Sequence, residues 1–177
     1  MRNSKSPLLV ISMGEPAGIG GEIILKAWGQ RSGTDPFFII DDPERLKKIN
    51  NLTKNEIPIQ IINTPSEAPE VFSKALPVLP IKSVSPLIAP VIPGQPDTAN
   101  AKAVIGSIEF AVRLVLEKKV DAIVTNPIHK KTLYESGFSY PGHTEFLAFL
   151  AKLNTPPVMM LASNDLKVVP VTIHQSL

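Results

Sequence analysis

Residues 8–28, LLVISMGEPAGIGGEIILKAW, contain the pattern that decides the fold class. Leu8–Met13 is a short apolar run that ends at Gly14. Apolar residues then recur at helical spacing between Ile19 and Trp28. A strand, a glycine-rich turn and a helix in this order are typical of the opening unit of an α/β protein.

The same alternation of strands and helices continues along the chain. Asp41 and Asp42 are placed to cap a helix that has Pro43 in its first turn. We predict an α/β fold with a mostly parallel sheet and helices on both faces. The predicted strands are 37–40, 57–62, 76–81, 120–125 and the adjacent pair 157–162 and 168–173, and the later predicted helices are 97–119, 130–136 and 144–153.

Eight prolines lie between Pro65 and Pro96. The apolar residues among them favour a rigid, extended connection over a flexible linker between domains, and the prolines at 77 and 80 are expected to weaken the strand that contains them. We predict a first α/β domain over residues 1–125 and the start of a second, incomplete one over 126–177. The chain ends just after its last predicted strand, so we expect a truncated fold.

Composition excludes several classes of partner. The 177 residues carry a formal net charge of +2 with no basic patch, so nucleic acid is not an expected partner. No apolar stretch approaches the ~18 residues of a membrane helix, so no membrane association is expected. The absence of cysteine excludes disulfides and thiolate ligands within this sequence. We therefore expect a cytoplasmic protein.

Two segments at predicted strand ends are candidate ligand sites. Residues 13–22, MGEPAGIGGE, join a strand to a helix, where backbone amides can bind an anion. Their glycine spacing matches neither a P-loop nor a dinucleotide fingerprint, and a tight turn that needs glycine is the alternative. Residues 125–130, TNPIHK, follow the carboxyl end of a strand, where Lys130 is either an anion ligand or a solvated lysine.

Two histidines complete the candidate residues. In PGHTEFLA, Thr144 is placed to cap a helix, which puts His143 just outside the helix N-terminus, where a negative ligand group is favoured. The alternative is a capping segment that happens to contain a histidine. His174 ends an apolar strand, a common position for a neutral imidazole metal ligand, although a lone histidine is more often structural.

Four segments of the chain carry a family resemblance: SMGEPAGIGGEI (12–23), PGQPDTANA (93–101), VTNPIHKKTLYESGFSYPGHTEFLA (124–148) and VTIH (171–174). Taken together, they resemble the 4-hydroxythreonine-4-phosphate dehydrogenase family of vitamin B6 biosynthesis. Glu15 and Gly21 stand where that family usually has aspartate and proline, and Asn126 and His129 where alanine and asparagine are commoner. The changes at 126 and 129 flank the substrate region and leave the exact substrate open.

The resemblance implies a fold like the isocitrate and isopropylmalate dehydrogenases, with two α/β domains around a cleft, in a homodimer. It implies that His143 and Thr144 bind a phosphorylated small-molecule substrate and that His174 is one of three histidine metal ligands. The other two ligands and most of the nicotinamide site would lie in a C-terminal half beyond residue 177.

The activity implied is the oxidation of 4-phosphohydroxy-L-threonine with NAD or NADP, followed by decarboxylation, in pyridoxal phosphate biosynthesis. A divalent metal would acidify the substrate alcohol. Zinc suits three imidazoles, and magnesium and cobalt stay open. The alternatives are a sibling dehydrogenase acting on another phosphorylated hydroxy acid or a cis-diol, and a non-catalytic fragment that binds ligand or dimerises.

Overall fold

The computed structural model describes residues 6–171, except for the side chain of Ser83. Its contacts divide the chain into two compact units, Met1–Ser139 and Tyr140–Leu177, which are described separately below. Within the described residues, no helix combines the length and the apolar character that a membrane span requires.

The first unit contains a five-stranded sheet in the order β3-β4-β2-β1-β5. Every neighbouring pair is parallel, as the alternation of strands and helices predicted. Leu9 of β1 lies opposite Phe37 of β2 on one side and Ala122 of β5 on the other. The strands are β1 Leu9–Ile11, β2 Phe37–Asp41, β3 Ile59–Ile61, β4 Leu76–Pro80 and β5 Ala122–Val124.

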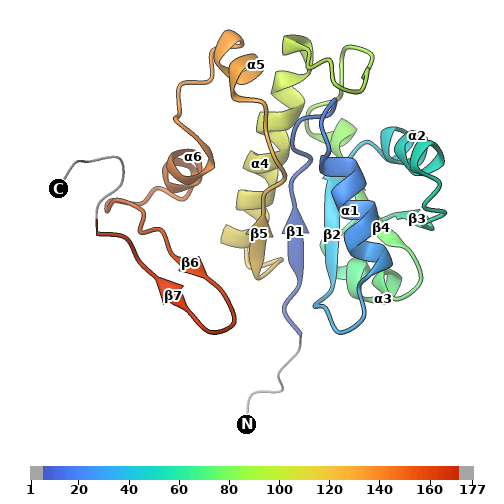
Figure 1. Cartoon of the computed structure of the whole chain (residues 1–177), viewed down its shortest axis with the longest axis horizontal. Coiled ribbons are helices and arrows are strands. Elements are labelled where there is room, and N and C mark those ends of the chain that lie inside the picture. Colours follow the sequence, from blue (N-terminus) through green and yellow to red (C-terminus); the bar gives the residue numbers. More distant parts are fainter. Residues whose placement is uncertain (1–5, 172–177) are drawn as a thin grey trace. The chain divides into compact units, whose positions relative to one another are not determined.

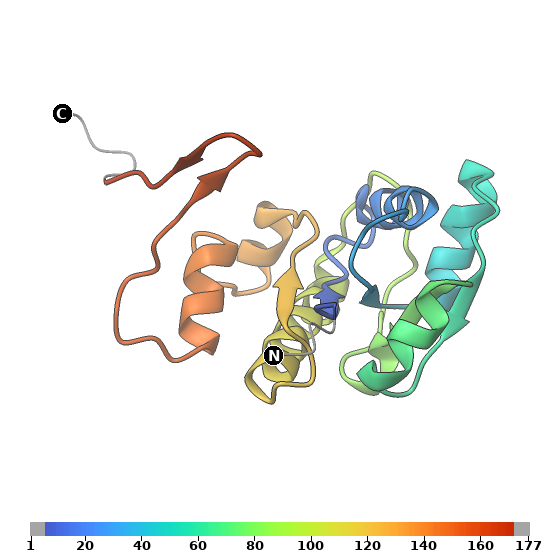
Figure 2. The same cartoon turned by 90° about the horizontal axis from the view of Figure 1, so that it is seen from below.

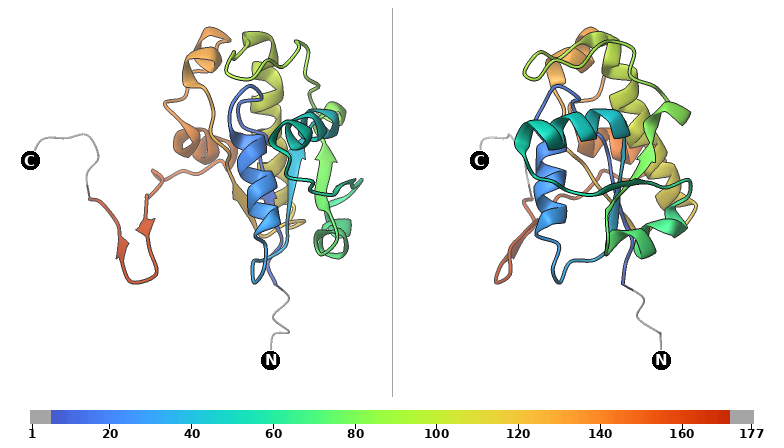
Figure 3. Two further views of the ribbon diagram at one scale, coloured as in Figure 1. Left: turned by 45° about the vertical axis from the view of Figure 1, so that its right-hand side comes forward. Right: turned by 90° about the vertical axis from the view of Figure 1, so that its right-hand side faces the viewer.

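Helices cover both faces of this sheet. The connections β1→β2 and β4→β5 run across the sheet in opposite directions, so right-handed crossovers place their helices on opposite faces. Figures 1 and 2 show α1 on one face and α4 on the other, and Figure 3 shows α2 beside α1. The helices of this unit are α1 Gly20–Gly29, α2 Pro43–Thr53, α3 Ala68–Phe72, α4 Ala101–Leu116 and α5 Lys130–Glu135, with short 3-10 turns at Pro65–Glu67, Ile81–Ser83 and Thr98–Asn100.

The core follows from the alternation of side chains along the strands. Ile39 of β2 packs in a cluster with Ile24 and Trp28 of α1. The Trp28 indole N–H donates to the Phe72 carbonyl at 3.0 Å, so the one polar atom of this ring is paired. Phe38, which alternates to the other face of β2, is also fully buried. Both faces of the central strands are therefore buried, which explains their continuous apolar sequence.

In the first half of the proline-rich stretch 65–96, the structure differs from the expectation that Pro77 and Pro80 weaken their strand. Pro77 and Pro80 lie in β4, which is an internal strand between β3 and β2 and is not weakened into an edge. The ladder to β3 is maintained by neighbouring residues, because the Leu76 N–H donates to the Pro58 carbonyl at 2.7 Å and the Ile62 N–H to the Val78 carbonyl at 2.9 Å. Proline is tolerated here because the hydrogen bonds use the residues on either side of it.

The second half of the stretch is an irregular connection, and Asn100 holds it in place. The Asn100 amide oxygen accepts from the backbone N–H groups of Ile88 and Ala89 at 2.9 and 3.0 Å, and its nitrogen donates to the Ala89 carbonyl at 3.1 Å. Asn100 is itself 3% exposed. The expectation of an ordered connection is therefore confirmed for this half.

The second unit contains α6 (His143–Leu150) and a hairpin of β6 (Leu161–Ala162) and β7 (Lys167–Val168). These strands are much shorter than the predicted runs. Helix α6 starts one residue earlier than expected, since Gly142 is its N-cap and no side chain caps it. The prediction that Thr144 caps this helix is therefore wrong: the extended backbone of Gly142 lets His143 become the first helical residue.

Candidate functional site

The candidate site lies at the carboxyl ends of β1 and β5. From β1 the chain passes to β2 on one side, whereas β5 lies on the other side of β1. This divergence is a topological switch point, where open α/β sheets bind ligands. Two segments meet there: residues 12–19, which we call the switch-point turn, and residues 125–129, which we call the switch-point loop. Both lie at the upper end of the sheet in Figure 1.

Backbone hydrogen bonds join these two segments. The Ser12 N–H donates to the Val124 carbonyl at 3.1 Å, and the Glu15 N–H donates to the Pro127 carbonyl at 2.8 Å. The Asn126 N–H donates to the Ser12 hydroxyl oxygen at 3.4 Å. The turn and the loop, which were separate candidates in the sequence, thus pack against each other at the ends of β1 and β5.

Glycine is required in the turn because the loop approaches it closely. Gly14 has φ of +70°, and a Cβ built on it would lie 2.6 Å from the Asn126 Cβ and 2.7 Å from the Pro127 carbonyl oxygen. At Gly20 a Cβ would lie 3.2 Å from the Asn126 side chain. Close packing of the turn on the loop therefore explains why these two positions are glycine.

The start of α1 supplies hydrogen-bond donors at this site. Its N-cap is Ile19, which offers no side-chain acceptor to the first amides of the helix. The nearby carboxylate of Glu15 accepts instead from the Ala17 N–H at 3.0 Å, inside the turn. No side chain therefore caps the first amides of α1, and a helix N-terminus of this kind favours an anionic ligand.

Asn126 adds a second donor that the sequence reasoning missed. The residue is 4% exposed, and its Nδ2 has no hydrogen-bond partner within residues 6–171. A buried unpaired amide costs about 1–3 kcal/mol, so this donor is unfavourable for stability as it stands. The available signal was an asparagine immediately after a strand at the switch point, and Asn126 had been noted only as a departure from the family pattern.

The other residues of this loop have local roles. His129 is the N-cap of α5: its Nδ1 accepts from the Thr132 N–H at 3.4 Å and lies 2.5 Å from the Thr132 hydroxyl. Nδ1 is therefore the acceptor, and a neutral ring carries its proton on Nε2. Lys130 begins α5 with an exposed side chain, which fits both the solvated and the anion-binding interpretation.

His143 and Thr144 lie together at the start of α6 in the second unit. His143 is half-buried. Thr144 lines a pocket of about 360 Å³ with otherwise apolar residues, including Leu147 and Pro157. His174 lies outside the described residues, so a shared site for these three residues stays a prediction.

The described residues do not by themselves form the metal site that the family resemblance implies. Between residues 6 and 171, no three side chains of His, Cys, Asp or Glu lie close enough to bind one metal ion. These residues therefore do not fit a three-histidine centre by themselves, and His174 as a ligand stays a prediction.

Comparisons with known proteins agree on the family. The chain is 48% identical over 175 residues to a 4-hydroxythreonine-4-phosphate dehydrogenase of Methylorubrum extorquens, and the match covers 96% of this chain and 49% of that protein. Crystal structures of 4-hydroxythreonine-4-phosphate dehydrogenases from Burkholderia phymatum and Klebsiella pneumoniae match with TM-scores of 0.84 and 0.83 and identities of 32% and 36%. Each match covers 97% of this chain and 51% or 52% of that structure.

The chain thus spans about half the length of the curated relatives it matches. The family model described as pyridoxal phosphate biosynthetic protein PdxA matches residues 33–177, which is well over half of the chain. The sequence resemblance is confirmed, and the chain belongs to the PdxA family of pyridoxal phosphate biosynthetic proteins.

Proposed function

We propose that this chain supplies the switch-point part of the substrate site in a dehydrogenase of 4-phosphohydroxy-L-threonine, acting in pyridoxal phosphate biosynthesis. The carrying observation is the buried, unpaired Nδ2 of Asn126, which lies at the switch point beside the start of α1, where no side chain caps the first amides. Both suit the acceptor oxygens of a phosphorylated hydroxy-amino acid. The shared name of the relatives supports this substrate.

In this proposal, the chain's own residues bind and orient the substrate. In the first unit, the switch-point turn and Asn126 bind its oxygens. In the second unit, His143 and Thr144 are the substrate-binding residues that the family resemblance implies. The reaction would be an oxidation of the substrate alcohol with NAD or NADP as the hydride acceptor, coupled to loss of carbon dioxide. A divalent metal would supply Lewis acidity, zinc being the best match to three histidines, and His174 would be one of its ligands. We assign no step of the oxidation to the described residues.

We also propose that the protein is a homodimer in the cytoplasm. In the second unit, Val158, Leu161 and Val171 are 77%, 61% and 99% exposed, and a dimer interface would remove such apolar side chains from water. The absence of cysteine suits a reducing compartment. A sedimentation measurement of the mass in solution tests the dimer.

Two alternatives remain in view. The first is a sibling dehydrogenase that uses another phosphorylated hydroxy acid or a cis-diol. The departures from the family pattern at Asn126 and His129, which flank the substrate region, are the reason for this alternative. A non-catalytic protein would keep the ligand-binding surface alone. A panel of substrates separates the first alternative, and the DNA sequence downstream of codon 177 separates the second.

The site residues are tested in a chimera that joins this chain to the C-terminal half of the Methylorubrum extorquens relative. His174→Ala should lower the bound metal per protomer, since a catalytic zinc site normally has three protein ligands. His143→Ala should leave the metal in place and raise KM about tenfold, because one hydrogen bond to the substrate is lost.

His129→Asn is the matched control. Asparagine is a good N-cap, so α5 should keep its start and the metal content should equal that of the parent chimera. Metal analysis and steady-state kinetics give both readouts. Full metal content in His174→Ala would remove His174 from the ligand set, and an unchanged KM in His143→Ala would remove His143 from the substrate site.

A further inference from the structure

Three consecutive residues of the switch-point turn are each held by a different part of the first unit. The Glu15 N–H donates to the Pro127 carbonyl at 2.8 Å, and the Gly94 N–H donates to the Ala17 carbonyl at 2.8 Å. Between them, the Pro16 carbonyl accepts from the Nε of Arg45 at 2.9 Å. Of these three contacts, the one to Pro16 is made by a side chain.

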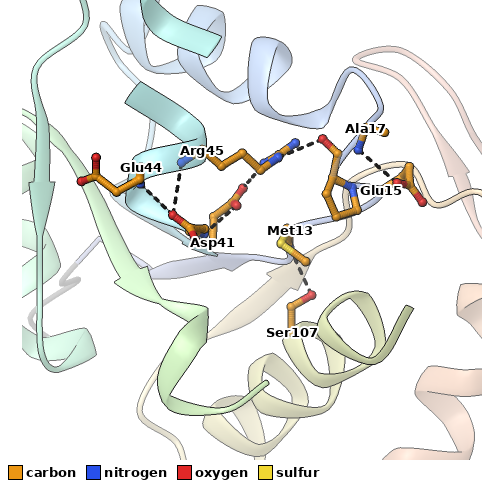
Figure 4. Close-up of polar contacts among 9 residues, drawn as sticks. Met13, Glu15, Ala17, Asp41, Glu44, Arg45 and Ser107 are labelled. Atoms are coloured by element: carbon orange, nitrogen blue, oxygen red, sulfur yellow. Dashed lines mark hydrogen bonds and ion pairs between the residues drawn. The ribbon is translucent and has the colours of Figure 1, made fainter. Parts of the chain in front are cut away.

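Arg45 is itself fixed by a buried carboxylate. It lies in α2, is 5% exposed, and its Nη1 is 2.6 Å from the Oδ2 of Asp41 at the end of β2 (Figure 4). Asp41 is fully buried, and its other oxygen accepts from the Asp42 N–H at 2.7 Å. Burial raises the pKa of Asp41, although the Arg45 charge acts in the opposite direction. The guanidinium thus links the end of β2 to the switch-point turn.

Gly21 at the start of α1 packs directly against α2. A Cβ built on Gly21 would lie 2.5 Å from the Cδ1 of Ile49, whereas the Nη2 of Arg45 would stay at an ordinary contact distance of 3.4 Å. The glycine at position 21 is therefore explained by its close contact with Ile49, the end of whose side chain would have to move for a larger residue.

Stability alone does not explain this ion pair. The Nη2 of Arg45 is buried and has no hydrogen-bond partner among the residues that the structure describes. An unpaired buried donor is unfavourable, and buried ion pairs are often no more stable than apolar residues of similar size. What the pair provides, and a methionine would not, is a directed hydrogen bond to the Pro16 carbonyl.

We propose that Arg45 is a positioning residue, which holds the switch-point turn through the Pro16 carbonyl and so fixes the backbone that faces the substrate. Its link to substrate binding rests on the proposed function, but its effect on the turn does not. Among the described residues, Arg45 makes no hydrogen bond to the switch-point loop. Its effect on that loop is therefore transmitted through the turn.

The test is amide hydrogen exchange in the 177-residue chain, read at Ala17 and Gly18, whose N–H groups both bond within the turn. Arg45→Met leaves the buried carboxylate of Asp41 without its ion-pair partner and should speed exchange in the turn and in β2. The double variant Asp41→Leu/Arg45→Met removes both charges. It should return β2 to normal protection while the two turn amides still exchange about tenfold faster, the effect expected for one lost hydrogen bond.

Two further variants complete the design. Arg45→Lys keeps the charge next to Asp41 but lacks the planar fork, so it should loosen the turn with little effect on β2. Lys47→Met is the matched control, because Lys47 pairs with Glu44 on the exposed face of the same helix and should change neither readout. The proposal would be overturned if the amides of Ala17 and Gly18 exchanged at the wild-type rate in both Arg45→Lys and the double variant.

A titration with 4-phosphohydroxythreonine separates this inference from the proposed function. If both hold, the wild-type chain binds the compound and the double variant binds it about tenfold more weakly. If the wild-type chain does not bind it while the turn amides respond as expected, the proposed function fails and the positioning role stands. Equal affinity in both proteins would limit Arg45 to a structural contact and contradict the proposal.

Discussion

Replacing Gly14 by alanine should lower the free energy of unfolding by roughly 2–4 kcal/mol. The loss has two causes: alanine is strained in a left-handed backbone conformation, and its Cβ would force packed neighbouring atoms to move. Gly14 has φ of +70°, and its Cβ would meet the Asn126 Cβ at 2.6 Å and the Pro127 carbonyl oxygen at 2.7 Å. Because one of these atoms belongs to the backbone, no side-chain rotation relieves the contact. Urea denaturation of the purified variant measures the loss.

Gly33→Ala is the matched control for this substitution. Gly33 has φ of +75°, but no atom lies within 4 Å of its Cβ position among the described residues. It should therefore lose only about 1 kcal/mol, the cost of the backbone conformation. The difference between the two variants isolates the contact between turn and loop. Equal losses would show that the switch-point loop does not pack on Gly14 in solution.

The 177-residue chain alone should produce no measurable NADH from 4-phosphohydroxythreonine. It contains three histidines, and His129 already uses Nδ1 to cap α5. A catalytic zinc normally has three protein ligands, and no such group occurs within the described part of the chain. The relatives that perform this reaction by name are about twice as long. We expect loss of the whole activity, which is a larger effect than any single substitution.

The assay supplies NAD or NADP together with zinc, magnesium or cobalt, and follows absorbance of the reduced nicotinamide. The chimera with the Methylorubrum extorquens half is the positive control, since it restores the length of the family. NADH production by the short chain above a His174→Ala control would contradict the expectation that further ligands are required.

The fold was predictable because its signals are local. The apolar runs at 8–13, 37–40 and 76–81 became β1, β2 and β4, and their alternation with helices implied a parallel sheet. Asp42 caps α2 as its sequence indicated, accepting from the N–H groups of Glu44 and Arg45. The strand order and the hairpin length depended on tertiary contacts, which no local pattern contains.

The candidate site was predictable only in part, because its features depend on contacts far apart in the sequence. The sequence singled out the turn at 13–22 and the loop at 125–130 separately. The hydrogen bond that joins them links Glu15 to Pro127, and these residues are separated by most of the sequence of the first unit. Asn126 drew attention only as a departure from the family, since an unpaired buried amide is visible only in a structure. For the same reason no pattern in the sequence pointed to Arg45.

The most direct test of the proposed site is a titration of the ¹⁵N-labelled chain with 4-phosphohydroxythreonine, followed by amide chemical shifts. The account predicts that the largest shifts occur in the switch-point turn, the first turn of α1 and the Asn126 side-chain amide, and that inorganic phosphate reproduces part of them. Asn126→Ala should weaken binding about tenfold. Shifts confined to other surfaces, such as the pocket beside Thr144, or no saturable shift at all, would contradict a substrate site at the ends of β1 and β5.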